Sequence, residues 1–235
     1  MRAIIKRDFK AYFNSPIAYV LIGLYMLLLG LFFNSFLGLG ISDIISEFVA
    51  SMSSLLILII PILTMRTLAE DKKNGTEVLL LTSPVRVTEI VLGKFFACFC
   101  VFLVMTAVTL IFPLIVIIAG KPDIMLIICS YLGYILIGAV YISLGVFASS
   151  LTENQIIASI ITLVSMFLIQ NIGYLANFFS GFLNKVFLWI SILDRYLDFI
   201  RGIIDLTTIV FMLSYMAVFI ILTVRVIERK RWSQG

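Results

Sequence analysis

The sequence predicts an all-helical, polytopic membrane protein with six transmembrane helices. Hydrophobic residues make up 62% of the 235 residues and charged residues only 13%, which is outside the range of soluble globular domains. The charges are also clustered, and the uncharged stretches between them approach or exceed the roughly 20 residues that a helix needs to cross a bilayer. Histidine is absent, so the commonest metal ligand and proton shuttle is missing and an intramembrane enzyme is disfavoured.

The first expected element is an interfacial helix within residues 2–15. Ile5, Phe9 and Tyr12 would share one face of this helix, which could rest on the membrane. The basic residues that would point away toward headgroups are Lys6, Arg7 and Lys10. The alternative is a basic flank without helical structure that only sets the topology.

Six membrane spans are expected after this helix. They cover residues 17–37, 52–67, 95–119, 124–150, 156–175 and 207–227. An even number of spans places both termini on the same side of the membrane. Pro61 and Pro113 fall inside two of the spans and are expected to kink them.

The lysines and arginines indicate the orientation of the spans. Thirteen fall on the side of the termini: Arg2, Lys6, Arg7, Lys10, Arg66, Lys72, Lys73, Arg86, Lys94, Arg225, Arg229, Lys230 and Arg231. Four fall on the other side: Lys121, Lys185, Arg195 and Arg201. Because cationic loops stay in the cytoplasm during insertion, both termini and the segment 67–94 are expected to be cytoplasmic. The net charge of +4 is thereby explained without nucleic-acid binding.

This cytoplasmic segment between the second and third spans carries an unusual run of charges. Glu70, Lys73 and Glu77 recur at i, i+3 and i+7, which predicts a short amphipathic surface helix over 70–82 that ends before Pro84. The alternative is a solvated loop whose charges only set the topology. The segment has no phosphate-binding G-x-x-x-x-G-K-[ST] motif, so the chain is not expected to hydrolyse ATP itself.

The sequence of this segment resembles the coupling loop of ABC-2 type exporter permeases. The matching or flanking residues, which the resemblance implies dock a cytoplasmic ATP-binding subunit, are Arg66, Glu70, Asp71, Lys73, Gly75, Thr76, Glu77, Leu80, Thr82, Pro84, Gly93 and Lys94. Two further stretches, residues 145–155 and 201–205, resemble the gliding-motility-associated branch of that family. The likeness extends over essentially the whole chain, so residues 1–235 are expected to form one transmembrane domain.

The resemblance also implies the partners. ATP and Mg²⁺ are expected in the ATP-binding subunit, while this chain binds no cofactor or metal itself. A second permease copy, as a homodimer or with a close paralogue, and an accessory membrane subunit are expected beside it. The complex is expected in a prokaryotic cytoplasmic (inner) membrane.

The stretch 174–206, on the opposite side of the membrane, is expected to re-enter the outer leaflet. A helix from residue 186 onward would place four polar residues on one stripe: Asp194, Asp198, Arg201 and Asp205. Arg201 could then pair with Asp198 or Asp205. The alternative is a seventh spanning helix over 186–204.

These observations favour a permease subunit whose energy comes from a separate ATPase. A membrane anchor or scaffold that recruits an ATPase without transport is the alternative from another class. A channel or secondary transporter ranks third, because the cores of the expected spans contain no charged residue that could bind a coupling ion. The lining residues of the spans suit lipids, peptides or drugs alike, so the cargo is left open.

Overall fold

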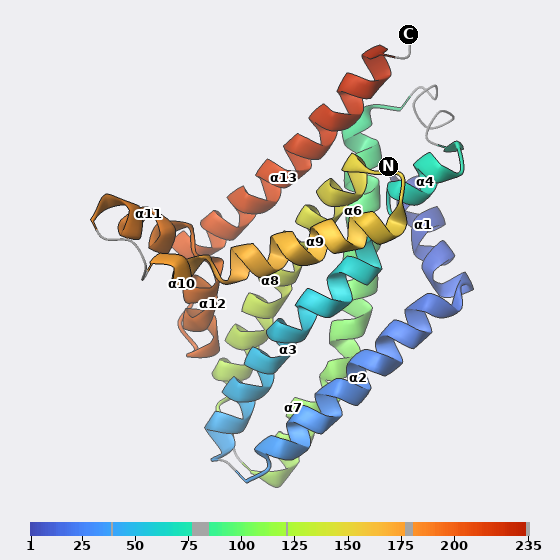
Figure 1. Ribbon diagram of the computed structural model, residues 1–235. Coiled ribbons are helices and arrows are strands. Elements are labelled where there is room, and N and C mark those ends of the chain that lie inside the picture. Colours follow the sequence, from blue (N-terminus) through green and yellow to red (C-terminus); the bar gives the residue numbers. More distant parts are fainter. Residues whose placement is uncertain (39, 77–84, 121, 177–180, 234–235) are drawn as a thin grey trace.

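A computed structural model describes residues 1–38, 40–76, 85–120, 122–176 and 181–233, and every regular element in these ranges is a helix (Figure 1). The helices are α1 (Arg2–Asn14), α2 (Pro16–Phe36), α3 (Ile41–Thr64), α4 (Ala69–Lys73), α6 (Val87–Thr109), α7 (Ile111–Ala119), α8 (Ile124–Leu151), α9 (Gln155–Gln170), α10 (Ile172–Ala176), α11 (Phe182–Ile190), α12 (Ile192–Ile200) and α13 (Leu206–Ser233). The predicted all-helical class is thus confirmed for the described residues.

Five helical segments are long and apolar enough to cross a membrane. They are Pro16–Phe36, Asp43–Lys73, Val87–Ala119, Ile124–Leu151 and Leu206–Arg229. The fifth expected span, 156–175, is instead divided into α9 and α10. At about 1.5 Å per residue, the 16 residues of α9 extend about 24 Å, less than the ~30 Å hydrocarbon core. The structure therefore supports a multi-pass membrane protein, with candidate membrane helices at five of the six expected spans.

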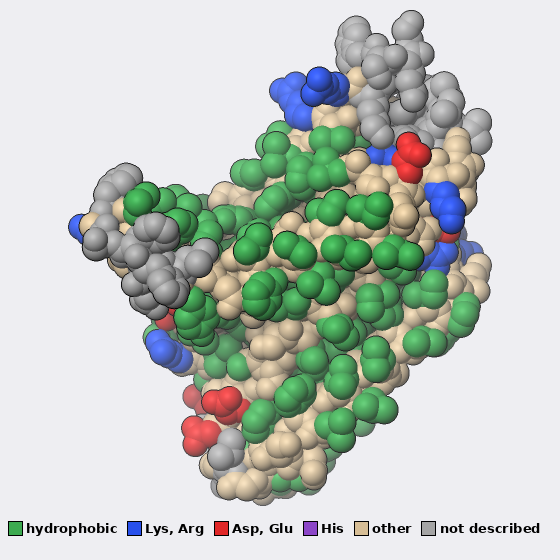
Figure 2. All heavy atoms as spheres, in the orientation of Figure 1, with side chains coloured by type: hydrophobic (Ala, Val, Ile, Leu, Met, Phe, Trp, Pro, Cys, Tyr) green, Lys and Arg blue, Asp and Glu red, His purple; other side chains and the backbone are tan. Residues whose placement is uncertain are grey.

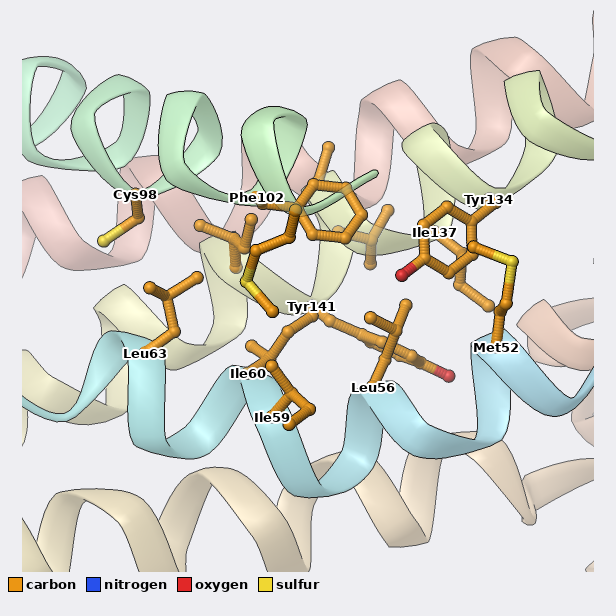
Figure 3. Packing of buried hydrophobic residues seen from close by; sticks show 14 of the residues in the cluster. Met52, Leu56, Ile59, Ile60, Leu63, Cys98, Phe102, Tyr134, Ile137 and Tyr141 are labelled. Carbon is orange, nitrogen blue, oxygen red and sulfur yellow. The ribbon is translucent and has the colours of Figure 1, made fainter. Parts of the chain in front are cut away.

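Helix α8 is the centre of the bundle and packs against α3, α6, α9, α12 and α13. Figure 3 shows side chains of α3, among them Met52, Leu56 and Ile60, directed toward Phe102 of α6 and Tyr134 of α8. Glycines make this packing possible, because a Cβ at Gly138 would lie 2.3 Å from Phe102 Cζ.

Two predicted boundaries were wrong by several residues. Helix α3 begins at Ile41 rather than at residue 52, because Asp43 and Glu47 both lie on its exposed face and do not interrupt it. Helix α6 begins at Val87 rather than at residue 95, so residues 87–94 form its first two turns. The third span is broken between α6 and α7, as expected near Pro113, which has no N–H to bond to the carbonyl of Thr109.

The expected continuous helix from residue 186 was also wrong, and so was its alternative of one span over 186–204. Ser191 ends α11 with an extended backbone and starts α12, where its Oγ accepts from Asp194 N at 3.4 Å. Gly202, with φ +80°, ends the helical turn after α12. In Figure 1 the N-terminus, α4 and the end of α13 lie toward one end of the molecule, and the α2–α3 and α7–α8 connections lie at the other.

Candidate functional site

The charged segment after α3 begins with one short helix. Helix α4 covers Ala69–Lys73, and Gly75 then adopts φ +71°, a left-handed conformation that glycine adopts without strain. The uninterrupted helix expected over 70–82 was therefore wrong in its first part. The predicted residues Glu77, Leu80, Thr82 and Pro84 lie outside the described residues.

Lys94 of α6 joins this segment to α1. Its side chain is only 4% exposed, and its Nζ donates to Thr67 O at 2.5 Å and to Asp8 Oδ2 at 3.3 Å. The same Nζ contacts Asp71 Oδ2 on α4. A buried ammonium is tolerated only where it is paired and hydrogen-bonded, so α1, α4 and α6 hold one another in place through this one charge.

Arg7 and Thr76 complete the surroundings of the two aspartates. Arg7 Nε donates to Asp8 Oδ1 at 2.7 Å, and Arg7 Nη2 lies 3.9 Å from Asp71 Oδ2. The hydrogen bond to Asp8 is the main cause that raises the pKa of Arg7. Thr76 Oγ1 donates to Asp71 Oδ1 at 2.8 Å, which fastens the residue after Gly75 back onto α4.

Arg66, just before α4, and Glu70 of α4 form a bidentate ion pair. The Nε–Oε2 distance is 2.7 Å and the Nη2–Oε1 distance is 2.8 Å. Parallel charge-assisted hydrogen bonds of this kind are among the strongest that side chains make. Because the two side chains are 22% and 32% exposed, both charges remain near water. Arg66 Nη1 also lies 3.4 Å from Ser15 Oγ, between α1 and α2.

The C-terminal end of α8 holds the start of α4. Ser149 Oγ accepts hydrogen bonds from Leu68 N at 3.1 Å and from Ala69 N at 3.0 Å. Lys72 Nζ of α4 in turn donates to the backbone oxygen of Ser150. A serine of one helix thus caps the first N–H groups of another, the role that an N-cap residue usually plays within one helix.

These residues surround a cavity of about 250 Å³ between α1, α4 and α6. Its charged lining residues balance in sign: Arg7, Arg66 and Lys94 against Asp8, Glu70 and Asp71. Tyr12 OH donates to Leu63 O at 2.7 Å at the base of the cavity, and burial raises the pKa of Tyr12 well above its ordinary value. A cavity whose charges are already paired is better suited to a joint between helices than to binding a phosphate or a metal ion. We call the segment 66–76 with its partners on α1, α6 and α8 the α4 junction.

The remaining predicted residues of this segment lie around the junction. Lys73 and Gly75 are exposed. Figure 2 shows basic and acidic side chains at the end of the molecule where Figure 1 places α4. Gly93 lets α1 approach α6, because a Cβ there would lie 3.0 Å from Ile4 Cγ2. Sequence reasoning missed Asp8 and Lys72. A signal for Asp8 was present, since it is the only acidic residue in the basic helix α1.

The polar residues at the other end do not form the expected stripe. Arg201 Nη1 lies 3.9 Å from Asp198 Oδ1, so this predicted pair is present, with 69% and 42% of the side chains exposed. Asp205 instead caps α13, where its Oδ1 accepts from Thr207 N at 3.0 Å. Asp194 lies on α12 and Asp205 beyond it, so no single helix carries all four residues.

Comparison with known families identifies the type of membrane protein. A family model described as ABC-2 family transporter protein matches residues 39–227, from just before α3 to near the end of α13. The match begins after α1 and α2, so Asp8 and Arg7 of the α4 junction lie outside it. No curated protein matches the chain.

Proposed function

This chain belongs to the ABC-2 family of transporter proteins, and we propose that it is the permease of an exporter whose ATP is bound and hydrolysed by a separate cytoplasmic subunit. The chain is a membrane component and carries no catalytic role in this scheme. ATP binding would move the partner subunit, the partner would move α4, and the spans would open a path for the substrate.

The α4 junction is the observation that supports this coupling. Lys94 links α4 to α1 and α6, and Ser149 links its first residues to α8. Because α8 packs against most of the bundle, a displacement of α4 would be passed to the helices around the core. Lys72 and Lys94 are both buried. In an unattached solvated loop, the alternative interpretation of this segment, these lysines would be exposed.

The remaining features of the proposal follow from the charge distribution and the family resemblance. Both termini and α4 face the cytoplasm of a prokaryotic cell, and α9 with α10 supplies the sixth crossing of the inner membrane. Helices α11 and α12 re-enter the outer leaflet. Residues 1–235 act as one transmembrane domain. Two permease copies assemble with two ATP-binding subunits and an accessory membrane subunit, as in the gliding-motility-associated branch.

Co-purification with a candidate ATP-binding subunit tests the docking surface. Lys73→Glu reverses an exposed charge on α4, and we expect the ATP-binding subunit to be lost from the complex. Arg229→Glu is the matched control, because Arg229 is also exposed but lies on α13. Equal retention by both variants would remove α4 as the docking element.

Glu70 needs a different design, because reversing it alone also breaks its pair with Arg66. The exchange Arg66→Glu with Glu70→Arg keeps an ion pair while it inverts the charge pattern that a partner meets. We expect the exchanged protein to stay folded and to lose the ATP-binding subunit. If the exchanged protein keeps that subunit while Glu70→Arg alone loses it, the ion pair stabilises the fold and is not recognised by the partner.

A further inference from the structure

A second cavity lies at the end of α9 that is remote from α4. It has a volume of about 270 Å³, is open on one side, and is lined by residues of α3, α9, α10 and α12. Its polar lining residues are Ser53, Ser54, Gln170, Asn171, Tyr174 and Tyr196. Its remaining walls are apolar, with Ile57 of α3 and Leu197 of α12 among them.

The lining includes a buried hydrogen-bond acceptor that has no partner. Gln170 is only 9% exposed, and its Oε1 has no hydrogen-bond partner among the residues that the structure describes. The hydroxyls of Ser53 and Ser54 both donate to Ala50 O, at 2.7 and 3.2 Å, which leaves their oxygens as acceptors. Asn171 Nδ2 donates to Phe167 O at 2.8 Å, so its amide oxygen is the group left for the cavity. A ligand that donates O–H or N–H groups would satisfy these oxygens.

The cavity also lacks charge. No Asp, Glu, Lys or Arg is among the described residues that line it. A phosphate or an ammonium group would lose its hydration there without gaining an ion pair, which is costly. The complementary ligand is therefore uncharged.

The position of the cavity indicates a lipid. Gln170 is the last residue of α9, about 22 Å along the helix from Gln155 at 1.5 Å per residue. Tyr174, just beyond it, is 61% exposed, as is typical of aromatic residues at the membrane–water interface. Below the cavity an apolar stripe of α9 is exposed and could lie beside acyl chains, within the hydrophobic face visible in Figure 2. The residues of this stripe are Ile160, Leu163, Val164, Phe167 and Leu168.

We propose that this cavity binds the uncharged, hydroxyl-bearing headgroup of a membrane glycerolipid, with the acyl chains along the exposed stripe of α9. Gln170 Oε1 accepts from the lipid hydroxyl, and the serine oxygens face the same headgroup. This site does not depend on the proposed transport function, since it would be occupied in the absence of any ATPase.

Photolabelling of the full chain in phosphatidylcholine nanodiscs tests the proposal. The probe is a diacylglycerol with a diazirine on one acyl chain, and labelled peptides are mapped by mass spectrometry. We expect labelling of α9 and α12 that excess unlabelled diacylglycerol removes. Gln170→Leu should lower this labelling about five- to tenfold, the value of one buried hydrogen bond to a neutral group. Ser159→Ala, whose hydroxyl bonds to Ile156 O at the other end of α9, should leave it unchanged.

A second pair of measurements separates the headgroup from the acyl chains. A competitor in which hydrogen replaces the free hydroxyl, a diester of propane-1,2-diol, lacks the donor without added bulk, and it should compete at least fivefold more weakly. Ala50→Leu fills the cavity from α3 and should abolish labelling. This second variant tests the proposal if Gln170→Leu does not fold. Equal competition by the lipid without the hydroxyl, or unchanged labelling in both variants, would overturn the proposal. Displacement of the probe by an uncharged apolar peptide but not by diacylglycerol would overturn the lipid assignment.

Discussion

The α4 junction and the segment of α10, α11 and α12 lie at opposite ends of α9 and are held in place by different interactions. At the junction, charged side chains are buried and join helices that are distant in sequence. Lys94 is 4% exposed, whereas the side chains of the Arg201–Asp198 pair at the end of α12 are 69% and 42% exposed. Buried pairs fix a geometry at high cost when broken, and exposed pairs contribute little. This difference suits the coupling role that we propose for the junction.

The segment of α10 to α12 relies on close packing and aromatic contacts. Gly133 of α8 allows Phe199 of α12 to approach, because a Cβ at Gly133 would lie 2.5 Å from Phe199 Cβ. Arg195 lies over the ring of Phe211 on α13, with 4.1 Å from its Cζ to the ring centroid. We therefore expect charge-removing substitutions to act mainly at the junction and volume-adding substitutions mainly at α12.

The largest effect should follow Lys94→Met. This change removes the buried cation between Asp8 and Asp71 and leaves them only the half-exposed Arg7, which should cost about 3–5 kcal/mol of unfolding free energy. Equilibrium unfolding in mixed detergent micelles measures it. Lys73→Met, which removes an exposed lysine from α4, is the control and should cost less than about 0.5 kcal/mol. Similar losses in both variants would contradict the distinction between buried and exposed charge.

Gly133→Ala should destabilise the packing of α12 against α8. The added methyl group would meet Phe199 and push α12 away from α8, which should cost about 1–3 kcal/mol. The same unfolding measurement, with hydrogen exchange of residues 192–200, reports it. Gly23→Ala is the control, because a Cβ at Gly23 has nothing within 4 Å. If Gly133→Ala speeds exchange in α4 as much as in α12, the two regions are not held independently.

Ser149→Ala should loosen the junction without changing its charge. Two backbone N–H groups, of Leu68 and Ala69, lose their acceptor, at an expected cost of about 1–2 kcal/mol. Hydrogen exchange of residues 68–73 should become about tenfold faster, since about 1.4 kcal/mol corresponds to a factor of ten. Ser143→Ala removes a buried hydroxyl that bonds only within α8, to Val140 O, and exchange of α4 should not respond to it. Unchanged exchange in Ser149→Ala would show that α4 is held without this cap.

The smallest effect should follow Arg201→Ala. Its pair with Asp198 is long and largely exposed, so its loss should cost about 0.2–1 kcal/mol and depend on salt. A double-mutant cycle with Asp198→Ala measures the coupling energy. A value above about 2 kcal/mol would show that this end of the protein also depends on ion pairs.

Local features of the sequence determined much of the fold. The bounds of α1, α2 and α8 were predicted to within one or two residues, because each helix coincides with a pattern that is complete in itself. Pro16 starts α2, and Asp123 caps α8 by accepting from Met125 N at 2.9 Å. The same approach failed at α3, because an uncharged stretch marks a membrane span but not the end of a helix whose charges face away from the core.

The junction shows what only the tertiary structure decided. The sequence pointed to Arg66, Glu70 and Lys94 as special, and the local pair of Arg66 with Glu70 lies within reach of sequence reasoning because the residues are one helical turn apart. It did not predict that Lys94 is buried against Asp8, 86 residues away, or that Ser149 caps α4 from 81 and 80 residues away. Hydropathy and helix capping depend on residues that are close together in the sequence, so they can be predicted from it. Which buried charges meet depends on how the helices pack, and the apolar faces that drive the packing carry little information about their partners.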